Sequence, residues 1–198
     1  MKIAVVLTRI PFPLMKGDKL RAYYQIKELA KQHEVYLFCL NYKDEEKKAK
    51  EELLKYCKAV HIERLNIFSS LLRVCLSIFT FLPFQTAYYN SKRAKKNFKS
   101  FVEKNKIEIC YFQFVRLAPF AKKINTKKVL DFQDTLSMNM KRRADNSGLL
   151  EKILFTIEAK RLARYESKMF NIFDALTIIT QADRELLQSP RKNEVYII

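Results

Sequence analysis

The first nineteen residues limit what this chain can fold into more than any other stretch. Lys2 to Thr8 is a short apolar run rich in β-branched residues, which is typical of a strand buried on both faces of a sheet. Arg9 to Lys16 then interrupts this run with two prolines, and apolar residues at helical spacing follow Asp18, which we interpret as an N-cap. The order strand, loop, helix predicts the first half of a βαβ unit.

The same alternation continues to the end of the chain. Further strands are expected at 34–40, 59–65, 107–114, 127–132, 173–180 and 194–198, most of them separated by helical segments. Because parallel strands need a crossover, this order predicts an α/β fold, a Rossmann-like parallel sheet with helices on both faces. The 198 residues are enough for one such domain, and their 48% hydrophobic content excludes a disordered chain. The last strand stops in mid-pattern, so we expect either a piece of a longer sequence or a single-domain protein.

Gly17 lies where a parallel sheet binds ligands, in the loop beyond the carboxyl end of the first strand. It is one of only two glycines in the chain. A glycine there lets backbone N–H groups approach a ligand, and a helix N-terminus favours an anion. The alternative interpretation is a glycine that only eases a tight turn. No G-x-G-x-x-G fingerprint is present.

Polar residues also follow two later strands. Gln113 and Arg116 come at the end of one strand, and Asp131 and Asp134 at the end of the next. The two aspartates have two open interpretations: they orient the hydroxyls of a substrate, or they cap helices. A long helix further on carries Glu158, Arg161 and Glu166. We interpret these three as surface ion pairs.

The cysteines point to a reducing compartment. Cys39, Cys57, Cys75 and Cys110 are far apart, include no C-x-x-C, and lie in apolar or amphipathic runs. We interpret them as buried, reduced thiols, which favours a cytoplasmic location, and we expect no metal site.

The net charge of +17 is the one extreme value of the composition. It predicts attraction to something anionic: nucleic acid, acidic lipid or phosphorylated substrates. Residues 67–84 are apolar nearly all round, and a very basic helix is expected at 90–105. We favour a buried helix for the apolar segment, and the open alternative is a patch that rests on the inner face of the plasma membrane beside the basic helix.

Three stretches resemble the N-terminal domain of GT-B glycosyltransferases of the glycogen-synthase-like, retaining kind (family 4 type). The resemblance is greatest to bacterial sugar transferases associated with exopolysaccharide and PEP-CTERM gene clusters. The stretches are R-I-P-F-P at 9–13 with K-G-D-K-L-R at 16–21, V-L-D-F-Q-D at 129–134 with Ser137, and E-A-K-R-L at 158–162 with Tyr165 and Glu166.

This resemblance implies a sugar transferase whose acceptor-binding domain is residues 1–198. The C-terminal domain that holds the nucleotide-sugar donor would be absent from this chain, which alone would then be inactive. The resemblance implies that Gly17, Asp18, Lys19 and Arg21 face the diphosphate of the donor or the acceptor. Relatives often carry a histidine near Gln113, which cannot act as a base, so we assign no catalytic residue.

The implied partners are a nucleotide-sugar and a polysaccharide or lipid-linked acceptor, and no cofactor is expected. The alternative, from charge alone, is a non-enzymatic basic α/β module that binds nucleic acid. Recognisable nucleic-acid motifs are missing from the sequence, which counts against it.

Overall fold

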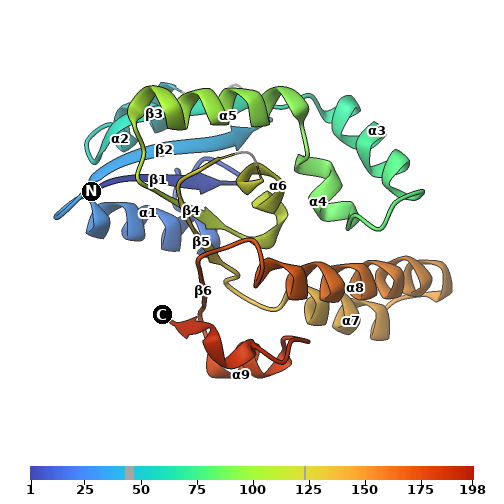
Figure 1. The fold of residues 1–198 in the computed structure, drawn as a ribbon. Coiled ribbons are helices and arrows are strands. Elements are labelled where there is room, and N and C mark those ends of the chain that lie inside the picture. The colour runs from blue at the N-terminus through green and yellow to red at the C-terminus, as the bar shows by residue number, and fades with distance from the viewer. Residues whose placement is uncertain (43–46, 123) are drawn as a thin grey trace.

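A computed structural model describes residues 1–42, 47–122 and 124–198, and within them seven strands form one sheet (Figure 1). Their order in the sheet is β3-β2-β1-β4-β5-β6-β7, and every pair is parallel. This confirms the expected Rossmann-like α/β fold. The strands are β1 (Lys2–Leu7), β2 (Glu34–Asn41), β3 (Cys57–Arg64), β4 (Ile109–Gln113), β5 (Lys127–Asp131), β6 (Ala175–Ile178) and β7 (Tyr196–Ile197).

Helices connect the strands over both faces of the sheet. They are α1 (Gly17–Leu29), α2 (Lys47–Leu53), α3 (Ile67–Ser77), α4 (Phe84–Tyr89), α5 (Lys92–Asn105), α6 (Ala118–Ala121), α7 (Leu136–Asp145), α8 (Leu149–Met169) and α9 (Gln181–Leu186). Two short 3-10 helices, η1 (Val115–Leu117) and η2 (Lys192–Glu194), complete the described part of the chain. The charged, amphipathic sequence at 43–58 predicts one surface helix. Helix α2 ends earlier, at Leu53, and residues 43–46 lie outside the described residues.

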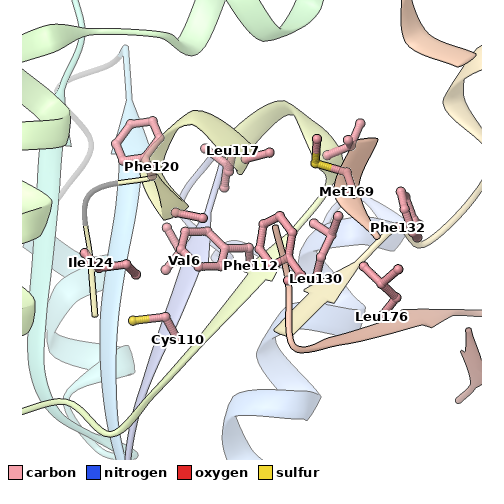
Figure 2. Close-up of a cluster of buried hydrophobic side chains, with 14 of the residues drawn as sticks. Val6, Cys110, Phe112, Leu117, Phe120, Ile124, Leu130, Phe132, Met169 and Leu176 are labelled. Carbon is pink, nitrogen blue, oxygen red and sulfur yellow. The ribbon is translucent and has the colours of Figure 1, made fainter. Parts of the chain in front are cut away.

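Alternate side chains of the central strands supply two separate cores. Ala4 and Val6 of β1 pack on the face that α5, α6 and the second half of α8 cover. Val5 and Leu7 pack on the opposite face, against α1 and α2. Figure 2 shows part of the first core, where Phe112 and other large side chains interlock. Burying one such side chain stabilises the fold by roughly 1.5–3 kcal/mol.

Two local expectations are wrong. On β3, the alternation of apolar and polar residues in the sequence predicts that Glu63 points outward. It is buried instead, and it accepts hydrogen bonds from Arg93 (3.2 Å) and Asn97 (2.9 Å) of α5. These bonds compensate the burial of its charge. All four cysteines are free and three are buried, but Cys75 is exposed.

The apolar segment at 67–84 departs most from expectation. It forms the helix α3 and a turn that ends where α4 begins, at Phe84. Helix α3 buries Ser70 and Ser77, while most of its large apolar side chains face outward. The favoured interpretation, a helix buried in the core, is therefore wrong for α3. The serines lie inward because polar groups beneath the helix bind that side of it, as described below.

Candidate functional site

The crevice where this fold binds ligands lies beyond the carboxyl ends of β1 and β4. From β1 the chain leaves through α1 on one face of the sheet, whereas β4 is reached through α5 on the other face. The connections therefore separate between these two neighbouring strands, which is the topological switch point of an open parallel sheet. The loops that follow β1, β4 and β5 meet at this edge.

A buried polar network forms the floor of the crevice. The carboxylate of Asp131, at the end of β5, has no exposed surface. Its Oδ2 accepts from the Arg21 guanidinium (2.5 Å) and from the Tyr111 hydroxyl (2.6 Å), and its Oδ1 accepts from the backbone N–H of Gln133 (2.9 Å). Both carboxylate oxygens are thus engaged within the protein, so Asp131 positions its neighbours.

Two glutamines extend this network toward β4. Gln25 of α1 donates to the Tyr111 hydroxyl (3.1 Å), and the Gln113 amide donates to Gln25 (3.4 Å). Burial raises the pKa of Tyr111, and the nearby negative charge of Asp131 raises it further. Tyr111 therefore stays a neutral donor, and Arg21, Gln113 and Asp131 belong to one rigid floor.

Above this floor, Arg116 lines a pocket of about 280 Å³. The other lining residues are Val74 of α3 and four residues of α4: Phe84, Gln85, Tyr88 and Tyr89. The Arg116 guanidinium lies 5.0 Å from the centre of the Phe114 ring, a cation–π contact. Two buried donors of this pocket, Arg116 Nε and Gln85 Nε2, find no hydrogen-bond partner among the described residues. Buried donors of this kind are normally satisfied, and both atoms are covered by the protein itself, so a rotation of each side chain is needed before a ligand in the pocket can accept from them.

Charged residues from three loops surround Arg116. Burial lowers the pKa of Arg116, and the nearby Tyr89, Asp134 and Asp18 oppose this shift. Asp18 itself forms an ion pair of 2.9 Å with Arg9, the second residue after β1. The structure thus brings Asp18, Arg116 and Asp134 together, and it adds Arg9 to them.

Asp134 is the acidic member of this group with an unused oxygen. Asn139 donates to its Oδ2 (3.0 Å), whereas its Oδ1 is buried without a partner among the described residues. Burial raises the pKa of Asp134, while the charge of Arg116 lowers it. A carboxylate oxygen in this position can accept a hydrogen bond from a ligand hydroxyl.

The backbone is strained beside the crevice. Phe114, directly after β4, has φ 73° and ψ 138°, and Gln133, two residues after β5, has φ 64°. Residues other than glycine rarely adopt positive φ, and such strain gathers at binding sites. At Phe114 it leads the chain directly into η1, which carries Arg116.

The first loop differs from expectation in one respect. The N-cap of α1 is Lys16 and Gly17 is the first helical residue, so Asp18 is not an N-cap. Asp18 sits in the first turn instead, where its charge favours the helix N-terminus and pairs with Arg9. Lys19 reaches back to the Phe12 carbonyl (3.4 Å), which holds the loop against the helix.

Within the part of the chain that the structure describes, nothing requires a glycine at position 17. Its φ is not positive, and an added Cβ would meet no atom within 4 Å. The interpretation as a residue that eases a tight turn therefore has no support in the backbone. Open space lies above the start of α1 at this point.

The three charged residues of α8 do not form the surface ion pairs that we expected. Glu158 is buried and accepts from the backbone N–H groups of Phe84 (2.7 Å) and Gln85 (2.9 Å), the first two residues of α4. Arg161 donates to the carbonyl of Ser77 (2.9 Å). Glu166, also buried, binds the backbone N–H (3.1 Å) and hydroxyl (2.6 Å) of Ser137. The helix α8 therefore holds α4, and with it the wall of the pocket.

Sequence reasoning missed Arg9, Gln85 and Tyr89 as parts of this site. The position of Arg9 just after the first strand could have identified it from the sequence, since ligands bind beyond the carboxyl ends of parallel strands. Gln85 and Tyr89 lie on α4, between an apolar run and a basic run, and only the packing of α4 over η1 brings them to Arg116.

The order of the strands and the helices on both faces define the class of this domain, a Rossmann-like α/β domain with a parallel sheet. Over its full length the chain is similar to the structure of Phytolacca americana UGT2 complexed with UDP-2fluoro-glucose and pterostilbene. The TM-score is 0.54 at 10% identity, and the match covers 54% of that chain. A second structure, TcCGT1 in complex with UDP, matches 99% of this chain and 50% of its own, with a TM-score of 0.49 at 13% identity.

This chain thus spans about half the length of the solved structures that it matches. No protein-family model matches the sequence, and neither does any curated protein. The likeness therefore lies in the fold.

Proposed function

We propose that this chain is the acceptor-binding domain of a glycosyltransferase that moves a sugar from a nucleotide-sugar to a polysaccharide or lipid-linked acceptor. One observation carries the proposal. On a fold shared with GT-B glycosyltransferases, the Arg116 pocket opens at the switch-point crevice with two buried donors unpartnered. The resemblance to exopolysaccharide-associated sugar transferases supports the finer assignment.

The chemistry of the pocket suits a sugar acceptor. Tyr88, Tyr89 and Phe84 present aromatic surface, against which the apolar face of a sugar ring packs. After a rotation of their side chains, Arg116 and Gln85 would donate to acceptor hydroxyls, and the nearby Asp134 would accept from a hydroxyl that extends beyond the pocket. A pocket with aromatic walls and few polar groups is typical of small-molecule sites.

The start of α1 would serve the donor side of the reaction. A nucleoside diphosphate gains negative charge as it leaves, and preorganised N–H groups and cations stabilise that charge. The N-terminus of α1 at Gly17 and the guanidinium of Arg9 lie beyond β1. In this proposal the rest of the donor is held by a second domain outside these 198 residues.

The test is sugar transfer by the protein encoded in its complete reading frame. Labelled nucleotide-sugars are offered with polysaccharide and lipid-linked acceptors, and kcat/KM is compared between wild type and Arg116→Gln. Loss of the buried guanidinium is expected to lower kcat/KM by about 10–100-fold, mainly through KM for the acceptor. The control is Arg142→Gln, an exposed arginine of α7. Wild-type kcat/KM in Arg116→Gln would remove this pocket from the acceptor site.

The second candidate, a module that binds nucleic acid, is favoured by one observation, the net charge of +17. A salt titration against random RNA and duplex DNA distinguishes the two. Tight binding at physiological salt with a steep dependence on salt concentration would favour the nucleic-acid module. We expect weak binding that salt abolishes.

A further inference from the structure

Helix α3 carries its apolar residues on the outside. Phe68 is 82% exposed, and Phe79 and Phe81, just beyond the helix, are 87% and 80% exposed. The other exposed apolar residues of this segment are Ile67, Leu71, Leu72, Leu76 and Ile78. A continuous apolar surface of this kind on a folded protein marks an interaction site. We call these eight residues the α3 face.

Specific bonds hold α3 in this orientation. On its inner side, Arg73 donates to the Ser70 hydroxyl (2.6 Å) and to the Tyr88 carbonyl (3.0 Å) of α4. At its end, Arg161 of α8 donates to the carbonyls of Ser77 (2.9 Å) and Ile78 (3.1 Å). These bonds hold the polar side of α3 against the rest of the protein, and the α3 face on the opposite side is therefore exposed to solvent.

A second apolar surface lies on the first half of α8. Leu149 and Leu150 are each 78% exposed, and Ile153, Leu154 and Ile157 follow on the same half of the helix. In Figure 1 both α3 and the start of α8 extend past the sheet on the same side of the molecule. The exposed basic residues Lys141, Arg142 and Arg143 lie at the end of α7, close to where α8 begins.

Positive charge accompanies the α3 face. From Leu65 to Val102 the sequence has no Asp or Glu but six Lys and Arg residues, five of them on α5. A hollow of about 570 Å³ at the start of α3 is lined by Arg64, Arg73 and Arg93 together with Ile67 and Phe68. Arg93 also forms an ion pair with Glu63, with 3.2 Å between Arg93 Nε and Glu63 Oε1. Cationic groups and exposed apolar side chains therefore meet at one end of α3.

We propose that the α3 face docks the protein on an anionic phospholipid membrane, with α3 lying in the plane of the interface. The phenylalanines and leucines would enter the boundary between headgroups and acyl chains, while the basic residues contact lipid phosphates. Charge complementarity favours an anionic partner, since residues 65–102 contain no Asp or Glu. The exposed phenylalanines and leucines beside this charge fit the boundary between headgroups and acyl chains, which favours a membrane. No helix in the described part of the chain is long and apolar enough to cross a membrane, and this mode of binding requires none. The inference goes beyond the proposed sugar transfer and is independent of it.

The test uses purified protein and vesicles of two compositions, phosphatidylcholine alone and phosphatidylcholine with phosphatidylglycerol. Co-sedimentation is expected with the anionic vesicles, and it should decrease with salt. Phe68→Ser/Phe79→Ser is expected to lower the partition coefficient by more than about tenfold. Lys92→Gln/Lys96→Gln is expected to lower it by about tenfold, on anionic vesicles only.

Two matched variants control for general effects. Leu54→Ser removes an exposed apolar side chain at the end of α2, and Lys104→Gln/Lys127→Gln removes two exposed charges at the amino edge of the sheet. Neither should change binding, and unfolding temperatures should stay equal because all these side chains are exposed. Equal binding to neutral vesicles, or no binding to anionic ones, overturns the proposal. So does a wild-type dimer that Phe68→Ser/Phe79→Ser converts to a monomer, since a second copy would then cover the α3 face.

Discussion

Arg21 on α1 and Asp131 at the end of β5 form an ion pair of 2.5 Å across 110 positions of sequence. The contact joins the helix that begins at Gly17 to the strand that leads into Asp134. It therefore fixes the first loop relative to the loops that carry the rest of the candidate site.

Asp131→Asn is expected to destabilise the fold by about 3 kcal/mol, because it leaves the Arg21 guanidinium without its buried counter-charge. Urea unfolding with an unchanged m-value measures the effect. Asp145→Asn, at the exposed end of α7, is the control and should change stability by less than about 0.5 kcal/mol. A similarly small change in Asp131→Asn would show that the ion pair contributes nothing to stability.

Glu158→Gln should loosen the wall of the Arg116 pocket. The charged carboxylate accepts the two first backbone N–H groups of α4, and hydrogen bonds to a charged acceptor each contribute roughly 1.5–3 kcal/mol. Hydrogen exchange at the Phe84 and Gln85 amides is expected to accelerate by about tenfold or more. The exposed Glu151 of the same helix provides the matched variant Glu151→Gln. Unchanged exchange at both amides would contradict the role assigned to Glu158.

Glu166 should make stability depend on pH. Burial raises its pKa from 4.5 to about 7, although the bonds from Ser137 oppose this shift. Because the folded pKa is raised, the stabilising contribution of the neutral form is complete below about pH 4.5 and is lost as the pH rises through 7. The stability of the wild type relative to Glu166→Gln is therefore expected to fall by about 3 kcal/mol over this window.

Urea unfolding of both proteins at several pH values measures this difference. The exposed Glu151→Gln variant, compared in the same way, should show a flat difference. A flat difference for Glu166→Gln as well would mean that Glu166 is ionised in the folded protein throughout this range.

Substitutions at Gly17 distinguish a structural role of this residue from a role in ligand binding. Since an added Cβ meets nothing within 4 Å, Gly17→Ala is expected to leave the fold intact and to raise stability by about 0.5–1 kcal/mol. Gly17→Val should also fold, yet it should abolish sugar transfer if a ligand occupies the open space above α1. Gly148, which likewise has open space around it, supplies the control Gly148→Val. Wild-type transfer in Gly17→Val would remove this loop from the reaction.

Much of the fold was predictable because its signals are local. Residues 3–7 and 35–40 are apolar throughout, as strands covered on both faces must be, and both strands lie inside the sheet with a neighbour on each side. The order of strands and helices then leaves a parallel sheet as the natural outcome.

The site was less predictable because its parts meet only in three dimensions. Arg21 binds Asp131 across 110 positions of sequence, and α4 reaches Arg116 only through the way the two segments pack. The positive φ at Phe114 and Gln133 carries no glycine signal. The orientation of α3 was hidden for a related reason, since Arg161, which binds the backbone carbonyls at the end of α3, comes from a helix more than 80 positions away.

One wall of the Arg116 pocket has a consequence for how the protein responds to its surroundings. Val74 of α3 lies in that wall, so the helix that carries the exposed α3 face also lines the Arg116 pocket. If engagement of α3 shifts Val74, affinity in the pocket changes by some factor, and thermodynamic reciprocity requires occupancy of the pocket to change the affinity at α3 by the same factor. Binding in the pocket and binding at α3 would then be thermodynamically coupled, so the affinity of the pocket would differ between the bound and the unbound state of α3.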